Sequence, residues 1–394
     1  MTAGSIIHEG RPSNASTTDA EPMTVDVPFG KISADAHIAE PRNLWADNLP
    51  RELKATAMQG IVATGDGGWE LTLDQNDMAR ARPEGERMLI CDRDHRRAIM
   101  REEGIVGECV FPTVGLYVWM LDDPLVGEAS SRIYNEWISD TLAGPPEFSC
   151  AGIVPTWSVE GALAEVGRIA SSRLGSVMLP AVAHPDWNHP VWEPLWSAIE
   201  ETDLPVVMHQ GTGHSMFTYR GPGAGVSNLM ATQSIAPRTV ALLANAGVLE
   251  RHPNLHFVFV EFNVGWLAWT MDTLDFYTAA FKKYGVTAHG KPWINPELPL
   301  KPSDYLRRQI HATFQDDTPA IHNVALTGSE GLLWGNDYPH EEGTYPDSRE
   351  VVARLVAELD EADARNIFRD NAARLFNFDL SQLEAPTQPH EPRE

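Results

Sequence analysis

The chain has few cysteines, few basic residues and no long apolar run. Its three cysteines, Cys91, Cys109 and Cys150, have the spacing of neither a metal site nor a disulfide framework, which suits a reducing cytoplasm. With 30 basic and 55 acidic residues, the net charge of −25 argues against nucleic acid or an anionic membrane as a partner. No apolar run approaches the ~20 residues of a membrane span. We therefore expect a cytoplasmic globular protein that acts on a small molecule.

Eight short apolar segments recur along the chain, each bounded by polar residues, glycine or proline. Such segments are typical of parallel strands that are covered on both faces. Helical patterns fill several of the intervals, and eight alternating strands favour closure into a (β/α)8 TIM barrel. No glycine-rich dinucleotide motif follows the first segment. The predicted strands span residues 31–38, 107–113, 151–156, 175–182, 205–211, 256–262, 309–314 and 331–338. The predicted helices span residues 127–143, 159–173, 191–202, 235–251, 347–358 and 360–376.

The barrel is expected over residues 29–379, between a disordered N-terminal arm (1–28) and a disordered C-terminal tail (380–394). Three connections are too long to be simple crossovers, and long loops on a rigid scaffold often carry specificity or form lids. The long insertions are expected after strands 1, 5 and 6, at residues 39–106 with a hairpin at 61–74, at 212–234 and at 285–308.

Residue types that bind metals stand at the ends of four predicted strands. Asp35 and His37 lie two residues apart, so both side chains project from the same face of the first strand. Glu261 lies in the apolar segment HFVFVEF, where an unpaired carboxylate would be costly to bury. Taken singly, His209 could be a core histidine; taken together, the positions predict a metal site above the barrel axis. The predicted ligands are Asp35, His37, Glu40, His209, Glu261 and Asp337.

Four segments contain these positions, DAHIAEP, HPVWEPLWSAIEETDLPVVMHQG, RHPNLHFVFVEFNVGW and GNDYPHEEGTYPDS, and a fifth, RNIFRDNAARLF, closes the predicted barrel. Together they resemble the metal-dependent amidohydrolase superfamily over about residues 30–378. More narrowly, they resemble amidohydrolase family 2, which includes the aminocarboxymuconate-semialdehyde decarboxylase-like enzymes. The resemblance implies a metal-dependent barrel enzyme and a homodimer.

Two positions depart from the pattern of that family. Many members have His-x-His at the first strand, where this chain has Asp35-Ala36-His37, and decarboxylating members usually have a histidine at the position of Glu261. The resulting oxygen-rich set with two imidazoles suits two divalent ions, with iron or manganese preferred over zinc. A similar dinuclear-iron, thioester-cleaving branch is known in bacterial diterpenoid biosynthesis.

We therefore expect a hydrolase that attacks a thioester, ester or amide carbonyl with metal-activated hydroxide. The resemblance implies that Asp337 is the general base. His214 and His340 follow the fifth and eighth strands, where either could donate a hydrogen bond to the developing oxyanion or simply be a solvent-exposed loop histidine. The alternative function is a mononuclear, non-oxidative decarboxylase of an aromatic or unsaturated carboxylic acid.

Overall fold

The computed structural model describes residues 27–57, 60–63, 69–72, 84–214, 218–287, 289–292, 296–340 and 342–383. Eight parallel strands form a barrel in the order β1-β4-β5-β6-β7-β8-β9-β10. These strands are β1 (Lys31–Ile38), β4 (Ile105–Pro112), β5 (Phe148–Ile153), β6 (Ser176–Pro180), β7 (Val206–His209), β8 (Phe257–Val260), β9 (Ile310–Phe314) and β10 (Leu332–Trp334). The (β/α)8 TIM barrel predicted from the sequence is confirmed.

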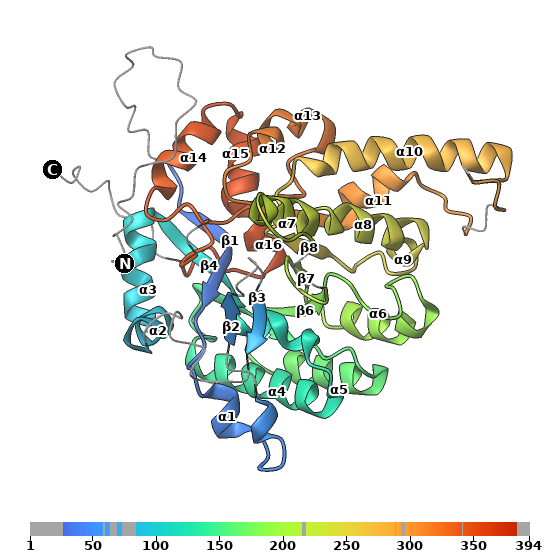
Figure 1. Cartoon of the computed structure of the whole chain (residues 1–394). Helices are drawn as coiled ribbons and strands as arrows, with labels where there is room; N and C mark the ends of the chain where they lie inside the picture. Colours follow the sequence, from blue (N-terminus) through green and yellow to red (C-terminus); the bar gives the residue numbers. More distant parts are fainter. Residues whose placement is uncertain are drawn as a thin grey trace.

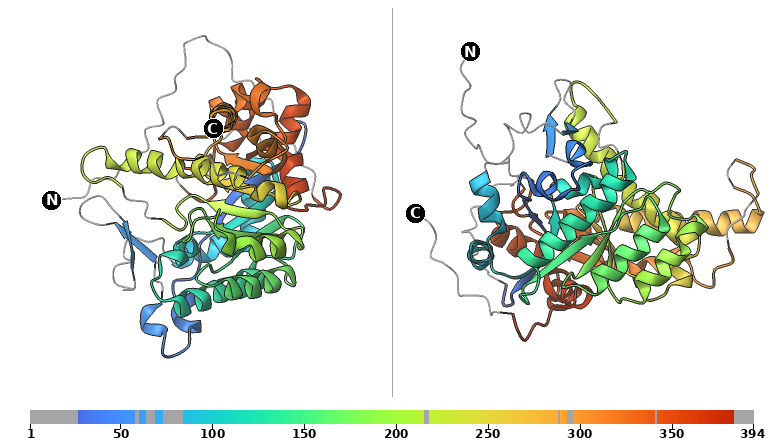
Figure 2. Two further views of the ribbon diagram at one scale, coloured as in Figure 1. Left: turned by 90° about the vertical axis from the view of Figure 1, so that its right-hand side faces the viewer. Right: turned by 90° about the horizontal axis from the view of Figure 1, so that it is seen from below.

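Helices surround the barrel strands on the outside, and α10 extends well beyond the barrel (Figure 1). A separate antiparallel pair, β2 (Gly60–Ala63) and β3 (Trp69–Thr72), lies beside the barrel, as Figure 2 shows. Among the described residues, no helix is both long and apolar enough to cross a membrane. The α-helices are α1 (Leu44–Asn48), α2 (Glu84–Cys91), α3 (Arg93–Glu103), α4 (Pro124–Thr141), α5 (Val159–Ala170), α6 (Glu193–Glu200), α7 (Ala224–Gln233), α8 (Ile235–Asn245), α9 (Val248–Arg251), α10 (Trp266–Tyr284), α11 (Pro302–Gln309), α12 (Thr318–His322), α13 (Val324–Thr327), α14 (Ser348–Val356), α15 (Glu361–Arg365) and α16 (Asn371–Leu375). Short helical turns are η1 (Lys54–Thr56), η3 (Val114–Met120), η4 (Pro190–Trp192) and the π-helical η5 (Asn366–Asp370).

The structure differs from the sequence-based expectation in several elements. The strand expected at 151–156 is β5, which begins earlier because its first residue, Phe148, pairs with β4 at Glu108. The hairpin expected at 61–74 corresponds to β2 and β3, and its turn lies outside the described residues. Helices α1 to α3, α7 and α10 to α13 were not predicted. Most of the expected N-terminal arm and C-terminal tail also lie outside the described residues, so those boundaries stay predictions.

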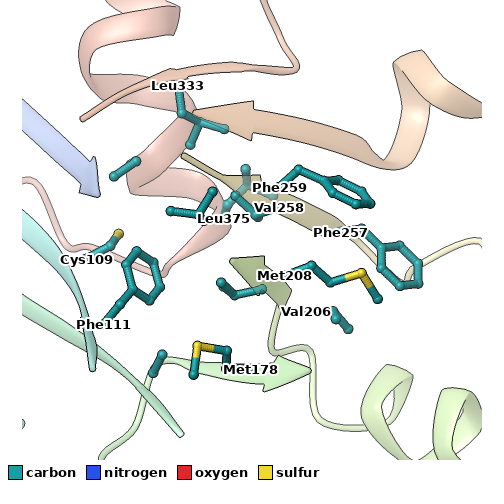
Figure 3. Packing of buried hydrophobic residues seen from close by; sticks show 14 of the residues in the cluster. Cys109, Phe111, Met178, Val206, Met208, Phe257, Val258, Phe259, Leu333 and Leu375 are labelled. Atoms are coloured by element: carbon teal, nitrogen blue, oxygen red, sulfur yellow. The ribbon is translucent and has the colours of Figure 1, made fainter. Parts of the chain in front are cut away.

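Apolar side chains from neighbouring strands form the core of the barrel. Figure 3 shows Met178 of β6 and Met208 of β7 near Phe257 and Phe259 of β8, with Phe111 of β4 among the same cluster. All five side chains are fully buried. Burying each of them contributes roughly 1.5–3 kcal/mol relative to exposure, so the core gives the strand ends a rigid base.

The barrel closes between β1 and the segment that follows β10. The backbone N–H of Asp337 donates to the carbonyl of Asp35 (2.8 Å), and the N–H of His37 donates to the carbonyl of Tyr338 (2.6 Å). Gly335 lies against the same strand, where an added Cβ would be 2.3 Å from the Cβ of Asp35. Only glycine allows this approach, so the closure determines where Asp35 and Asp337 stand.

We predict that Gly335→Ala destabilises the protein by about 2 kcal/mol, because the new methyl group must displace the backbone of β1. The matched control is Gly167→Ala in α5, where an added Cβ meets nothing within 4 Å. We expect the control to stabilise the helix by up to about 1 kcal/mol. Urea unfolding of both variants measures the difference, and equal stability of the two would contradict the close approach at Gly335.

Candidate metal centre

Five of the predicted ligands meet at the carboxyl end of the barrel. Asp35 and His37 belong to β1, and His209 is the last residue of β7. Glu261 follows β8 directly, and Asp337 follows β10 after a two-residue step. The side chains of all but Glu261 are fully buried, and that of Glu261 is 13% exposed. The structure therefore brings together residues that lie up to three hundred positions apart in the sequence.

The two histidines turn the same ring nitrogen toward the site. Nδ1 of His37 donates to the carbonyl of Pro112 (2.8 Å), and Nδ1 of His209 donates to the carbonyl of Gln210 (2.9 Å). With Nδ1 protonated in each ring, the neutral form has a lone pair on Nε2. The two Nε2 atoms are 3.1 Å apart. Two lone pairs at this distance repel each other unless a cation or a proton lies between them, and this is the arrangement of metal-binding imidazoles.

The carboxylates surround the same two nitrogens. Nε2 of His37 is 3.4 Å from Asp337 Oδ1 and 3.6 Å from Asp35 Oδ1, while Nε2 of His209 is 3.6 Å from Glu261 Oε2. Oδ1 of Asp35 and Oδ2 of Asp337 are buried and accept no hydrogen bond from any described residue. A buried carboxylate oxygen without a donor is costly, so these oxygens suit coordination to a cation.

The electrostatics of the site reflect this crowding. Burial, followed by the charges of Asp337 and Asp35, holds the pKa of Glu261 well above its usual range. Burial and the charge of Asp35 likewise raise the pKa of Asp337. Burial lowers the pKa of His37, with further lowering from His340 and His209. A bound dication would relieve the repulsion between the carboxylates and stabilise their ionised forms.

Glu261 and Asp337 also have strained backbones. Their φ angles are +67° and +55°, in the left-handed region that residues with a Cβ rarely adopt. The backbone N–H of Glu261 donates to Oγ1 of Thr313 (2.9 Å), which holds the residue in this conformation. Backbone strain of this kind costs of order 1–3 kcal/mol per residue and is concentrated at functional sites, where it fixes the direction of a side chain.

Three overlapping groups of side chains have ligand atoms within 4.8 Å of one another. His37 belongs to the first two groups and Asp337 to the last two, so the three groups form one continuous centre. Their donors, imidazole nitrogen and carboxylate oxygen, fit a divalent metal ion. The groups are Asp35, His37 and His209; His37, Asp337 and His340; and Glu261, Asp337 and Glu342.

Glu40 lies outside these groups. Its two carboxylate oxygens accept hydrogen bonds from the backbone N–H groups of Val114 (3.0 Å) and Gly115 (2.8 Å) at the start of η3. A carboxylate that stabilises the first turn of a helical segment in this way has a structural role of its own. These hydrogen bonds give a structural explanation for a buried glutamate after the first strand, and its role as a ligand stays a prediction.

The two predicted oxyanion donors are placed differently. His340 joins the centre: its Nδ1 is 3.1 Å from Asp337 Oδ1, and its ring centroid is 4.0 Å from that of His37. His214 lies in the loop after β7 and belongs to none of the three groups found among the described residues. The catalytic roles of His214, His340 and Asp337 stay predictions.

Several residues beside the centre were not predicted. Glu342 is exposed and belongs to the third group, and Gln210 donates to Glu261 Oε1 (3.3 Å). Gln315 follows β9 directly, and its Nε2 is 3.5 Å from Asp35 Oδ2. Tyr117 of η3 is close enough to Glu261 that burial and this charge together raise its pKa. Gln210 and Gln315 carried a sequence signal, since each is a polar residue at a strand end like the predicted ligands.

The comparison with protein families assigns the chain to one family. The amidohydrolase family model matches residues 34–378, and the chain belongs to this family. The matched range begins one residue before Asp35 and ends after the last barrel helix, so it includes every residue of the centre.

Individual relatives share this architecture. The chain is 25% identical over 205 residues to gamma-resorcylate decarboxylase of Rhodococcus jostii strain RHA1, and the match covers 49% of this chain and 56% of that protein. The solved structure of 5-carboxyvanillate decarboxylase LigW from Sphingomonas paucimobilis superposes with a TM-score of 0.65 at 21% identity, covering 89% of this chain and all of the other. The solved structure of dihydroxybenzoic acid decarboxylase from Polaromonas sp. JS666 contains bound manganese and the inhibitor 2-nitroresorcinol. It superposes with a TM-score of 0.62 at 16% identity, covering 89% of this chain and 97% of the other.

These findings correct the expectation of a hydrolase. The relatives are named as decarboxylases of aromatic acids, which agrees with the alternative and not with acyl hydrolysis. The error came from giving decisive weight to Glu261, whereas a carboxylate at that strand end can hold an ion without determining which bond the site breaks. The expected thioesterase activity has no support in these relatives, and the metal named in their structures is manganese rather than iron.

We predict that Mn²⁺ raises the unfolding temperature of the metal-free protein by several degrees, because the ion binds the folded site and not the unfolded chain. His209→Ala should abolish this increase. Glu40→Gln should lower the starting temperature, because it weakens hydrogen bonds to η3, yet it should keep the Mn²⁺ effect. Differential scanning calorimetry with and without Mn²⁺ measures the starting unfolding temperature and its increase with Mn²⁺ for each variant. If Mn²⁺ no longer raised the unfolding temperature of Glu40→Gln, Glu40 would be a ligand as the sequence predicted.

Proposed function

We propose that this protein is a divalent-metal-dependent, non-oxidative decarboxylase of a hydroxylated aromatic carboxylic acid. The observation that carries the proposal is the buried set of two histidines and three carboxylates at the carboxyl end of the barrel. The support from relatives is the match to proteins named gamma-resorcylate and 5-carboxyvanillate decarboxylase. The chain spans about half the length of the curated relative that it matches, so the substrate class is part of the proposal.

The reaction places two demands on the protein. When the bond between the ring carbon and the carboxylate breaks, CO2 leaves and the electron pair stays on the ring carbon, which must then take a proton. A bound divalent ion would supply positive charge to hold the carboxylate and the adjacent phenolic oxygen of the substrate. His37, His209 and Asp337 would hold this ion, and their burial keeps bulk water away from the reacting carbon.

Asp337 and His340 are the proposed proton source. Oδ1 of Asp337 and Nδ1 of His340 are 3.1 Å apart, close enough to share one proton. The side chain of Asp337 is fully buried, whereas that of His340 is 20% exposed. A proton taken from solvent at His340 can therefore pass to Asp337 at the edge of the site, and this pair replaces the proton that the ring carbon consumes.

We expect the protein loaded with Mn²⁺ to release CO2 from at least one acid in a panel that includes 2,6-dihydroxybenzoate and 5-carboxyvanillate. His340→Gln should reduce kcat by about 10²-fold or more, because proton transfer by a positioned side chain contributes 10²–10⁴-fold. It should also slow the exchange of the ring proton of the product with D2O, followed by NMR, since this exchange uses the same proton source.

The matched control is His322→Gln, because His322 is exposed and, among the described residues, pairs with Glu358 on the surface. This variant should keep wild-type CO2 release and wild-type exchange. Absence of CO2 from every acid in the panel would refute the proposed function. Wild-type exchange in His340→Gln would leave decarboxylation intact but refute the role of His340.

A second ion is part of the proposal. Asp35, Glu261, Asp337 and Glu342 together carry more negative charge than one dication neutralises, and the substrate adds a further carboxylate. Asp337 is shared between a histidine-rich group and the carboxylate group formed with Glu261 and Glu342, so two neighbouring ions could use it in common. The oxygen-rich donors favour manganese or iron. The homodimer and the cytoplasmic location likewise stay predictions.

We predict about two ions per chain in the wild type and about one in Glu342→Gln, because Glu342 belongs only to the carboxylate group. Elemental mass spectrometry on protein purified without chelator measures the count. The control is Glu160→Gln at the exposed start of α5, which should keep the wild-type count. One ion in the wild type would contradict the second ion. Two ions in Glu342→Gln would contradict its proposed location.

A further inference from the structure

A hollow lies at the opposite end of the barrel strands from the metal centre. It has a volume of about 630 Å³ and is formed where β5 and β6 begin, by the turn at residues 143–146 and by the end of the last helix. We call it the arginine hollow, after Arg93 and Arg173, which line it and are the charged residues among its described lining. No residue of the metal centre contributes to it.

The two arginines meet at the same turn of the chain. Arg93 is the first residue of α3, and its Nη2 donates to the carbonyl of Ala143 at a long 3.4 Å. Arg173 follows α5 and lies over Gly144, where an added Cβ would be 3.3 Å from Arg173 Cδ and 3.6 Å from Nη1. Gly144 has a φ of +115°, a conformation suited to glycine, and both guanidinium groups lie beside this turn.

The positive charge in the hollow is not neutralised by the described residues. Neither Arg93 nor Arg173 forms an ion pair with a described carboxylate, and the buried Nε of Arg93 has no acceptor among them. The acidic residue next to the lining, Glu147, is held by Arg97 at 2.6 Å. The hollow therefore has a local positive charge in a chain whose net charge is −25. Guanidinium groups in this state bind oxyanions through two parallel hydrogen bonds.

Ser149 adds an independent observation. It lines the hollow and is only 7% exposed, and its Oγ has no hydrogen-bond partner among the described residues. An added Cβ on Gly175 would lie 2.0 Å from this Oγ, so the glycine leaves room for the hydroxyl. A buried hydroxyl without a partner costs roughly 1–3 kcal/mol unless a ligand or water satisfies it.

The remaining wall is apolar. Phe148, Phe376 and Phe378 line the hollow, and each is less than 10% exposed. Such a site, with a small number of polar groups beside aromatic side chains, is typical of pockets that bind a small organic molecule in one orientation. The arginines would bind the charged end of the ligand, and the phenylalanines would contact its carbon skeleton.

We propose that the arginine hollow binds a small organic oxyanion, a carboxylate or a phosphate ester on an apolar body, independently of the metal centre. The two guanidinium groups bind the anion, and the hydroxyl of Ser149 donates a further hydrogen bond to it. The inference does not depend on the proposed decarboxylation, because none of its residues belongs to the metal centre.

Isothermal titration calorimetry tests the proposal with two probes, phenyl phosphate and benzoate, on the metal-loaded protein at constant ionic strength. Either probe can also bind at the metal centre. The readout is therefore the part of the binding heat that the wild type shows and that Arg173→Gln and Arg93→Gln lose. We expect the affinity of one site to fall at least about tenfold in each variant. The probe with the larger loss distinguishes a phosphate from a carboxylate ligand. Arg173 is exposed, so this variant should fold normally.

The matched control is Arg354→Gln, since Arg354 is about half exposed and pairs with Asp316 elsewhere on the surface. It should bind both probes as the wild type does. The proposal is overturned if both arginine variants bind both probes with wild-type affinity, or if the wild type shows no binding that depends on Arg173.

Discussion

The repulsion between carboxylates buried at one point of the barrel is the constraint on which the rest of the site depends. Asp35, Glu261 and Asp337 come from three strands, and their charges raise the pKa of Glu261 and of Asp337 in addition to the effect of burial. Without a cation, such a group of carboxylates would be ionised only at a high cost in free energy. A divalent ion held by these carboxylates and the two histidines would remove this cost and would supply positive charge for chemistry.

The surrounding fold resists this repulsion by several contacts. The fully buried Arg96 donates from Nη1 to the carbonyl of His37 (2.8 Å) and from Nε and Nη2 to Glu108 (3.0 and 2.7 Å). Arg96 therefore fixes the end of β1 at His37, while the close contact with Gly335 fixes β1 at Asp35. Phe111 packs against both ligand rings, with ring centroids 6.2 Å from His37 and 5.6 Å from His209. These contacts preorganise the histidines and Asp35, whereas Glu261, Asp337 and His340 stand in the segments that follow their strands.

The candidate ligands at the strand ends could be found in the sequence because an isolated carboxylate or histidine stands out in an apolar segment. This reasoning placed Asp35, His37, His209, Glu261 and Asp337 together, and the structure agrees. It could not separate Glu40, whose carboxylate binds backbone N–H groups of η3, from a ligand, because both follow a strand in the same way. Glu342 and helix α10 were missed for a different reason: Glu342 is exposed, and α10 exposes Trp269 and Phe276, so its apolar periodicity is blurred.

The reaction was the part that the sequence predicted least well. The same set of ligands can activate water for hydrolysis or hold a carboxylate for decarboxylation, and no single residue distinguishes the two. The most direct test of the central claim is a crystal structure of the protein grown with Mn²⁺, with the ion located by anomalous scattering. The account predicts an anomalous peak between Nε2 of His37 and Nε2 of His209, within bonding distance of Asp337. A fully formed barrel with no peak between these two nitrogens would contradict it.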